Sequence, residues 1–334
     1  MGWSKGQVLA RGLEWTGIGP GLRRMGSWRG ALVLNYHRIG DSADSNLDRA
    51  LWSATADQLD RQLAFVARNF DVIGPAELAA AAAAPRGRRV LVTFDDGYRD
   101  VYTVAFRLLE ANGIRATLFL CTGFIDGRAS PWWDEIAWML RSSADAALAP
   151  GPWAADHLPL SGPCLETSIA RVNQSYRTLE PEPAARFLEA LATATGAGRR
   201  PRDPTDWITW EMAREMRAAG HEIGAHTVTH PLLARLPVER QREEIVGALD
   251  RIEAELGERS RWFSYPVGLR DTFTDETSTC LREAGVEHAF SNYGGYVHHA
   301  GLCPLDVPRS NVGPALTGPS FHAVLTLPQF CARV

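Results

Sequence analysis

One stretch decides the fold: Val90-Leu91-Val92-Thr93-Phe94-Asp95-Asp96-Gly97-Tyr98. In it, two adjacent carboxylates follow directly on an apolar run. The run from Val90 to Phe94 predicts a buried strand. In barrels and open α/β sheets, catalytic groups gather where such strands end. Neighbouring side chains of an extended segment point to opposite sides, so we expect Asp95 and Asp96 to have different tasks. One can bind a metal while the other stays a free base, although an isolated Asp-Asp-Gly also fits an acidic turn that only closes the strand.

A second stretch, Gly224-Ala225-His226-Thr227-Val228-Thr229-His230-Pro231, contains two histidines four residues apart. Neutral imidazole is a common metal ligand, and two rings at this spacing can face one point. The β-branched residues between the histidines and the proline after them favour a loop or an irregular turn over a long helix. Two unrelated surface histidines are the alternative. Together with the Asp-Asp-Gly turn, however, the pair favours a metal site.

These two stretches, together with Phe263-Ser264-Tyr265-Pro266-Val267-Gly268, resemble the motifs of the polysaccharide deacetylases with a NodB homology domain, carbohydrate esterase family 4. The resemblance extends over residues 30 to 310. It implies that Asp96, His226 and His230 hold one divalent metal ion and that Asp95 is the general base for the attacking water. Zn²⁺ suits these ligands best, and Co²⁺, Ni²⁺, Mn²⁺ or Fe²⁺ can also bind a mixed nitrogen and oxygen site.

The resemblance also implies which residues contact the substrate and the developing oxyanion. These are Tyr98, Tyr265, Pro266 and Val267. The backbone N–H of Val267 is expected to donate to the oxyanion. Many members of the family have an arginine where this chain has Ser264, so the group that holds the base must come from elsewhere. Arg309 is the candidate, because it follows the last expected strand and a buried carboxylate needs a nearby cation to stay ionised.

The departing amine needs a proton donor, and His37 is the candidate for this general acid. The late histidines His298, His299 and His322 do not match the family's pattern. His37 closes the first expected strand, and a barrel brings that strand end to the same mouth as Asp95. The pair Tyr36-His37 also resembles the aromatic-histidine pair that supplies the acid in members with a permuted motif order. The alternative is a histidine that only caps the strand or binds the metal.

The order of apolar runs predicts an α/β fold, a distorted (β/α)7 barrel of the NodB type with parallel strands. Strands are expected at 31–36, 71–73, 90–94, 116–121, 221–225, 261–265 and 287–291, and helices at 55–70, 76–84, 101–112, 211–219 and 238–256. We divide the chain into an N-terminal basic amphipathic segment at 1–28, a deacetylase-like domain at 29–315 and a C-terminal tail at 316–334.

The alternation of strand and helix lapses between residues 125 and 207, which predicts an inserted, mainly helical subdomain. Trp132 and Trp133 stand at the start of this insertion, shortly after a strand end. Two interpretations remain open for the pair. It anchors the insertion, or it borders the mouth of the barrel as a platform on which a sugar stacks.

The composition narrows the class of protein. With 334 residues, 45% of them hydrophobic, the chain can bury a large core, and its formal charge of -4 gives no reason to expect a nucleic-acid partner. Its five cysteines include no Cys-x-x-Cys pair, which favours reduced thiols.

No secretory signal is recognisable, so we expect a cytoplasmic protein. The N-terminal segment either contacts the inner membrane face peripherally or packs on its own domain. Its apolar residues are Trp3, Val8, Leu9, Leu13, Trp15 and Leu22, and its basic ones are Lys5, Arg11, Arg23 and Arg24.

The leading functional hypothesis is a metal-dependent hydrolase that removes the N-acetyl group of an amino sugar. The sugar belongs to a polysaccharide, an oligosaccharide or a lipid-linked glycan, as in cell-envelope or exopolysaccharide biosynthesis. Two alternatives remain: an amidase that acts on a non-sugar N-acyl or cyclic amide, and a catalytically impaired glycan-binding protein. The missing arginine at Ser264 favours the impaired protein, whereas the four intact polar groups favour an enzyme.

Overall fold

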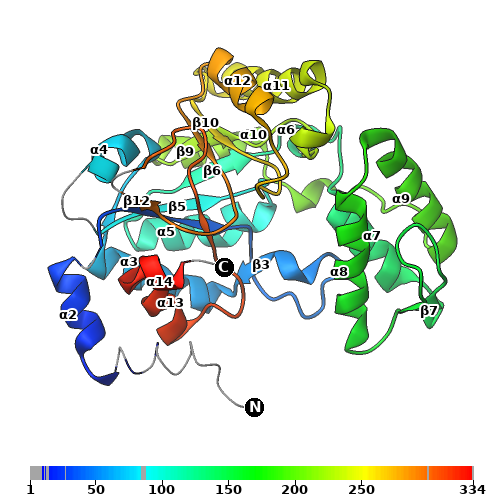
Figure 1. The fold of residues 1–334 in the computed structure, drawn as a ribbon, viewed down its shortest axis with the longest axis horizontal. Helices are drawn as coiled ribbons and strands as arrows, with labels where there is room; N and C mark the ends of the chain where they lie inside the picture. The colour runs from blue at the N-terminus through cyan, green and yellow to red at the C-terminus, as the bar shows by residue number, and fades with distance from the viewer. Residues whose placement is uncertain are drawn as a thin grey trace.

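The computed structural model describes residues 10, 12, 15–26, 28–83, 88–298 and 301–332. Its centre is a curled sheet with helices around it (Figure 1). Parallel strands cross the sheet in the order β11 (His288–Phe290), β10 (Trp262–Ser264), β9 (Glu222–Ala225), β6 (Thr117–Leu120), β5 (Arg89–Phe94) and β1 (Gly30–Tyr36). A further parallel strand, β4 (Asp71–Val72), pairs with the start of β5. These seven strands confirm the predicted barrel-like fold.

Two short strands beside β1 were not anticipated from the sequence. β12 (Val297–His298) pairs antiparallel with the start of β1, and β13 (Ser310–Asn311) pairs parallel with its end. An isolated bridge between Phe290 and Val307 joins the segment before β13 to β11. This segment therefore connects the two ends of the curled sheet. As a result, the carboxyl ends of strands far apart in sequence face one common mouth.

Local sequence signals set the bounds of the helices. α3 (Ala56–Asn69) begins at Thr55, whose side chain forms a reciprocal capping box with Gln58. α11 (Val238–Leu256) ends at Gly257, whose φ of 76° is readily adopted by glycine. The remaining helices of the barrel are α4 (Leu78–Ala83), a π-helical turn at Val101–Phe106 that continues into α5 (Arg107–Ala111), α6 (Thr122–Ile125), α10 (Trp210–Ala218) and α12 (Asp275–Glu283).

The insertion forms a helical unit beside the barrel, drawn in green in Figure 1. It contains α7 (Trp132–Ser142), the hairpin of β7 (Ala147–Leu148) and β8 (Leu158–Pro159), α8 (Cys164–Arg177) and α9 (Pro181–Thr195). Its apolar side chains form a hydrophobic cluster separate from the main core, together with Tyr98, Cys121 and Phe124 of the barrel. Tyr98 fixes this unit to the Asp-Asp-Gly turn: its hydroxyl donates to Asp134 (2.7 Å) and accepts from Nε1 of Trp133 (3.0 Å).

The stretch expected as a C-terminal tail is packed against the barrel. α13 (Gly318–Thr326) buries Phe321 and Leu325 in the main core, and α14 (Pro328–Cys331) follows it. α13 contacts α2 (Ile18–Met25), α3 and α14, and these elements lie together in Figure 1. The tail is therefore part of the folded domain.

The N-terminal segment contacts this C-terminal unit. Nη1 of Arg23, on α2, donates to Thr326 on α13 (2.9 Å), so Arg23 faces inward and not outward from a basic surface. Trp3, Lys5, Val8, Leu9, Arg11 and Leu13 lie outside the described residues. No helix in the described part of the chain is long and apolar enough to cross a membrane.

The packed C-terminus gives a stability test. Leu325 is fully buried, so Leu325→Ala should lower the free energy of unfolding by about 2–5 kcal/mol. Phe330, on α14, is 75% exposed, and Phe330→Ala should change that free energy by no more than about 0.5 kcal/mol. Urea denaturation followed by fluorescence measures both. Equal stability of the two variants would show that α13 contributes nothing to the core.

Candidate active site

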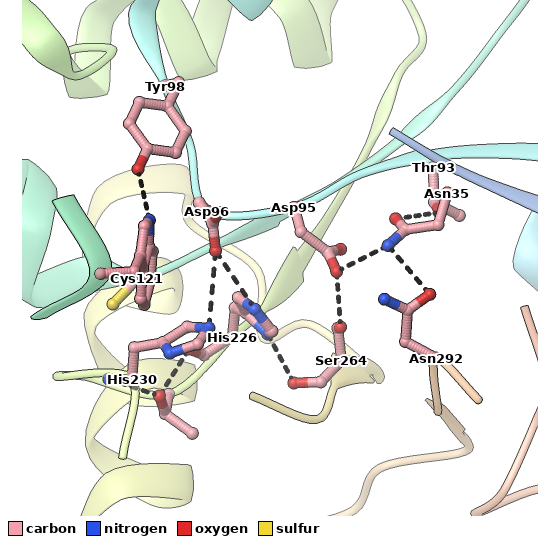
Figure 2. Close-up of polar contacts among 12 residues, drawn as sticks. Asn35, Thr93, Asp95, Asp96, Tyr98, Cys121, His226, His230, Ser264 and Asn292 are labelled. Carbon is pink, nitrogen blue, oxygen red and sulfur yellow. Dashed lines mark hydrogen bonds and ion pairs between the residues drawn. The ribbon is translucent and has the colours of Figure 1, made fainter. Parts of the chain in front are cut away.

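Asp96, His226 and His230 converge at the carboxyl ends of β5 and β9 (Figure 2). The Nε2 atoms of His226 and His230 lie 3.4 and 3.6 Å from the same oxygen, Oδ1 of Asp96. One ligand atom from each of the three side chains lies within 4.8 Å of the others, and all three residues are buried. The structure therefore brings together the three residues that the family resemblance implies as metal ligands.

The donor set fits a metal ion. Both carboxylate oxygens of Asp96 are buried without a hydrogen-bond partner among the described residues. A carboxylate in this position needs a cation nearby, because burial without a partner is unfavourable. Nδ1 of His226 lies 2.7 Å from the carbonyl oxygen of Ser264 and donates to it, which leaves the lone pair of Nε2 facing Asp96. Burial lowers the pKa of His230 to about 3, so this ring is in the neutral form that binds metals.

The backbone is strained at this site. In the described ranges four residues other than glycine have a positive φ: Asp96 (73°), Thr227 (65°), His230 (59°) and Val267 (62°). Each such conformation costs about 1–3 kcal/mol and persists only where surrounding contacts enforce it. One of these contacts is a hydrogen bond from the backbone N–H of His230 to the hydroxyl of Thr227 (3.0 Å). The strain is confined to the segments that carry the metal ligands and the turn after β10.

Asp95 is held by a cationic and polar network. Nη1 and Nη2 of Arg309 donate to Oδ1 and Oδ2 of Asp95 at 2.8 and 2.7 Å, in a bidentate pair. Oδ2 also accepts from the hydroxyl of Ser264 and the side-chain amide of Asn35, both at 3.2 Å. Burial raises the pKa of Asp95, but the Arg309 guanidinium outweighs this effect and holds the pKa below its usual range. Asp95 is therefore ionised and points away from the metal ligands (Figure 2).

The sequence position of Arg309 explains how Ser264 is compatible with this network. Arg309 precedes β13, on the segment that connects β11 to β1, and its side chain is fully buried. Ser264 lies on β10, and its hydroxyl accepts from Nη2 of Arg309 (2.8 Å) while it donates to Asp95. The cation beside Asp95 thus comes from a different segment than position 264, where the family motif usually has arginine.

His37 lines the same cavity as Asp95, Asp96, His226 and His230. The cavity has a volume of about 290 Å³. The backbone N–H of His37 donates to Ser53 (2.9 Å), whereas no described residue hydrogen-bonds to its ring. Burial lowers the pKa of His37, and the charges of Asp96 and Asp95 act in the opposite direction. The ring is therefore free to contact a ligand in the cavity.

The residues expected to bind substrate divide into two groups. Tyr265, Val267, Trp132 and Trp133 line the cavity, and Tyr98 and Pro266 do not. The Tyr265 hydroxyl donates to the carbonyl of Leu305 (2.6 Å), so only its ring is available. Val267 occupies a tight turn closed by a hydrogen bond from the Gly268 N–H to the Pro266 carbonyl (2.6 Å), and no described residue accepts from its own N–H. Trp133 contacts His230, with ring centres 4.5 Å apart.

Sequence reasoning missed several polar residues of the site: Asn35, Asp48, Arg177, Asn292 and Asn311. Asn35 carries a recognisable signal, because it is the polar residue in the otherwise apolar run before Tyr36. Arg177 carries none, since it ends a helix of the insertion and reaches the cavity only through the tertiary fold.

Comparison with known proteins identifies the family. Residues 82–289 match the model of the polysaccharide deacetylase family, which is more than half of the chain. The chain therefore belongs to the polysaccharide deacetylases, as the sequence motifs predict. This membership supports deacetylation of a glycan.

Two solved structures share the fold. The Streptococcus pyogenes deacetylase PplD in complex with acetate is 19% identical with a TM-score of 0.57, and the match covers 90% of this chain and 97% of that one. IcaB from Ammonifex degensii is 22% identical with a TM-score of 0.57, and the match covers 89% of this chain and 97% of that one.

The uncharacterized protein YlxY of Bacillus subtilis (strain 168) is 33% identical over 58 residues, which span 17% of this chain and only 18% of YlxY.

The Asp95–Arg309 pair gives a test of stability against pH. The pKa of Asp95 is lower in the folded protein than in the unfolded chain. The pair therefore stabilises the fold fully when the pH is above the pKa of the unfolded chain, and this stabilisation is lost as the pH falls through the pKa of the folded protein. Arg309→Met leaves a buried unpaired carboxylate and should cost about 3–5 kcal/mol at neutral pH. Burial then raises the pKa of Asp95, so the difference in unfolding free energy between native protein and variant should shrink as the pH is lowered.

Urea denaturation of metal-free protein at several pH values measures this difference. The double variant Asp95→Asn with Arg309→Met serves as the control, because it has no carboxylate to protonate. Its stability relative to Asp95→Asn alone should not depend on pH. A difference between native protein and Arg309→Met that stays constant from about pH 8 to about pH 4 would contradict the pairing.

Proposed function

We propose that this protein is a metal-dependent N-deacetylase that acts on an N-acetylated amino sugar of a glycan or glycolipid. One observation supports it above all: Asp96, His226 and His230 converge beside an ionised Asp95 in one cavity. Family membership and the sequence motifs support the same reaction. From the sequence we expect the substrate in the cytoplasm or at the inner membrane face.

Asp96, His226 and His230 would hold the metal, and Zn²⁺ is the ion that their donor atoms suit best. A divalent ion there supplies a Lewis acid that polarises the amide carbonyl and lowers the pKa of a water molecule. Asp95 accepts the proton of the attacking water, because it is ionised and is not needed as a ligand. Arg309, Ser264 and Asn35 orient its carboxylate.

The other cavity residues complete the reaction. The N–H of Val267, held in its strained turn, donates to the developing oxyanion. His37 gives a proton to the departing amine, and this transfer is favourable because an amine is more basic than an imidazole. Trp132 and Trp133 are buried in the cluster of the insertion, which favours an anchoring role, and only the small exposed part of each ring lines the cavity. Tyr98 contributes by fixing the insertion that carries these two tryptophans.

A glycan-binding protein without activity was the alternative from another class. Its supporting observation was the missing arginine at Ser264. Arg309 beside Asp95 now favours catalysis, because the cation that orients the base is present in the fold.

Acetate release tests the proposal. Protein loaded with Zn²⁺ should release acetate from N-acetylated glycans, tested as free, polymeric and lipid-linked sugars. His226→Ala removes one of three protein ligands, so metal content and acetate release should both fall by at least about tenfold. His157→Ala, an exposed histidine, should change neither. Elemental analysis and an acetate assay measure the two quantities, and equal metal content in native protein and His226→Ala would sink the ligand assignment.

The role of His37 is tested with two kinds of leaving group. His37→Ala should keep its metal and lose about 10²–10⁴-fold in turnover on amides, because the departing amine needs a proton. The loss should be much smaller on an activated aryl acetate, whose leaving group departs as an anion. If both substrates lose activity equally, or if the variant loses its metal, His37 is not the general acid.

A further inference from the structure

One charged residue of the active-site cavity has no part in the chemistry described above. Arg177, the last residue of α8, lines the cavity that also contains Asp95, Asp96 and the metal-ligand histidines. It comes from the insertion, whereas the catalytic residues come from the barrel. Arg177 is therefore placed to contact a substrate whose amide lies at the metal site.

The guanidinium of Arg177 has no carboxylate or hydrogen-bond partner among the described residues, and its side-chain contact is with the Trp132 ring. Within the described part of the chain it forms neither an ion pair nor a hydrogen bond, and its Nε is buried without an acceptor. Several other arginines of the insertion are paired. Arg141 contacts Glu166 at 2.8 Å and Arg200 contacts Asp206 at 2.7 Å, and both Glu135 and Glu189 contact Arg199. An arginine that lines a cavity without a carboxylate partner has donors left for a ligand.

The acidic residues whose charges act on Arg177 do not satisfy these donors. Burial lowers the pKa of Arg177, and the charges of Asp48 and Asp271 raise it, so both carboxylates are close enough to influence the guanidinium. Neither lies within ion-pair distance of it. The carboxylate of Asp48 instead accepts from the backbone N–H of Ala50 (3.1 Å) and from the side-chain amide of Asn173 (2.9 Å). Asp48 thus lessens the cost of burying Arg177 without occupying its N–H groups.

The charges of the cavity leave room for an anion. Arg309 offsets Asp95, and Arg177 offsets Asp48, which also lines the cavity. A divalent ion would outweigh the single charge of Asp96. An anionic group would thus meet no unbalanced carboxylate at the catalytic centre. A planar guanidinium matches the geometry of a carboxylate or a phosphate and can bind either by two parallel hydrogen bonds.

Trp132 provides the neighbouring surface. The guanidinium carbon of Arg177 lies 5.7 Å from the centre of the Trp132 ring, and Trp132 lines the same cavity. Trp132 is itself stacked against Tyr176, with ring centres 4.6 Å apart. A rigid aromatic ring next to a guanidinium suits a sugar ring that bears an acidic substituent.

We propose that the preferred substrate is an acidic amino sugar, whose carboxylate or phosphate is bound by Arg177 while its N-acetyl group lies at the metal site. This inference rests on the proposed deacetylase function and narrows its substrate class. In this view the insertion selects the substrate and the barrel performs the chemistry.

Matched glycosides test the inference with the full-length, metal-loaded protein. The neutral substrate is the methyl glycoside of N-acetylglucosamine, and the two acidic ones carry a carboxylate or a phosphate at carbon 6. Acetate release should give a kcat/KM about 10- to 100-fold higher for at least one acidic glycoside, as expected for a charge-assisted contact. The acidic glycoside that is preferred identifies the anion.

Arg177→Gln should bring the ratio of acidic to neutral kcat/KM close to one. Arg171→Gln is the matched control, because Arg171 lies on the same helix, pairs with Asp156 at 3.6 Å and does not line the cavity. It should keep the full preference. An equal kcat/KM for neutral and acidic glycosides in the native protein, or an acidic preference that survives in Arg177→Gln, would overturn the inference.

A native protein that releases no acetate from any glycoside contradicts the proposed function instead. Binding of the same three glycosides, measured by saturation-transfer NMR, then decides the inference separately. Acidic glycosides that bind to native protein and to Arg171→Gln but not to Arg177→Gln would support it. Equal binding to all three proteins would refute it.

Discussion

The pair of Asp95 and Arg309 is the interaction on which the site depends. Two carboxylates adjacent in sequence are both buried, at 2% and 1% exposure, and repulsion would protonate one of them unless each had its own cation. The pair with Arg309 keeps Asp95 ionised, and the two free oxygens of Asp96 are then suited to a metal ion. The different surroundings of the two neighbouring aspartates thus follow from the position of Arg309.

The closure of the curled sheet places Arg309 beside Asp95. The segment before β13 bridges to β11 at Phe290 and continues along β1, so its arginine enters the barrel between the first and the last main strands. Ser264 leaves space for the guanidinium and joins the network through its hydroxyl, while its carbonyl orients His226. One small residue therefore contacts both the Asp95–Arg309 pair and His226. The strained turns at Asp96, His230 and Val267 are held by the same surrounding barrel.

The sequence predicts features that depend on local patterns. The seven parallel strands follow from apolar runs, and Asp95, Asp96, His226 and His230 follow from motifs whose spacing has a chemical reason. Features that depend on long-range pairing were not predicted. The two-residue strands β12 and β13 have no periodicity of their own, and residues 316–334 were expected as a tail because short apolar helices do not show what they pack against. Arg309 was proposed because a buried carboxylate needs a nearby cation to stay ionised, but its two hydrogen bonds to Asp95 could be seen only in the structure.

The insertion shows why the substrate is harder to infer than the reaction. The groups that would act on the amide come from the ends of barrel strands, where backbone geometry restricts them. The wall formed by Trp132, Trp133 and Arg177 comes from helices whose sequence carries no catalytic motif. Tyr98 joins the two parts, because it follows the catalytic turn in sequence and yet bonds to Asp134 and Trp133. A change in the insertion can therefore alter which sugar reaches the metal site without moving the residues that act on it.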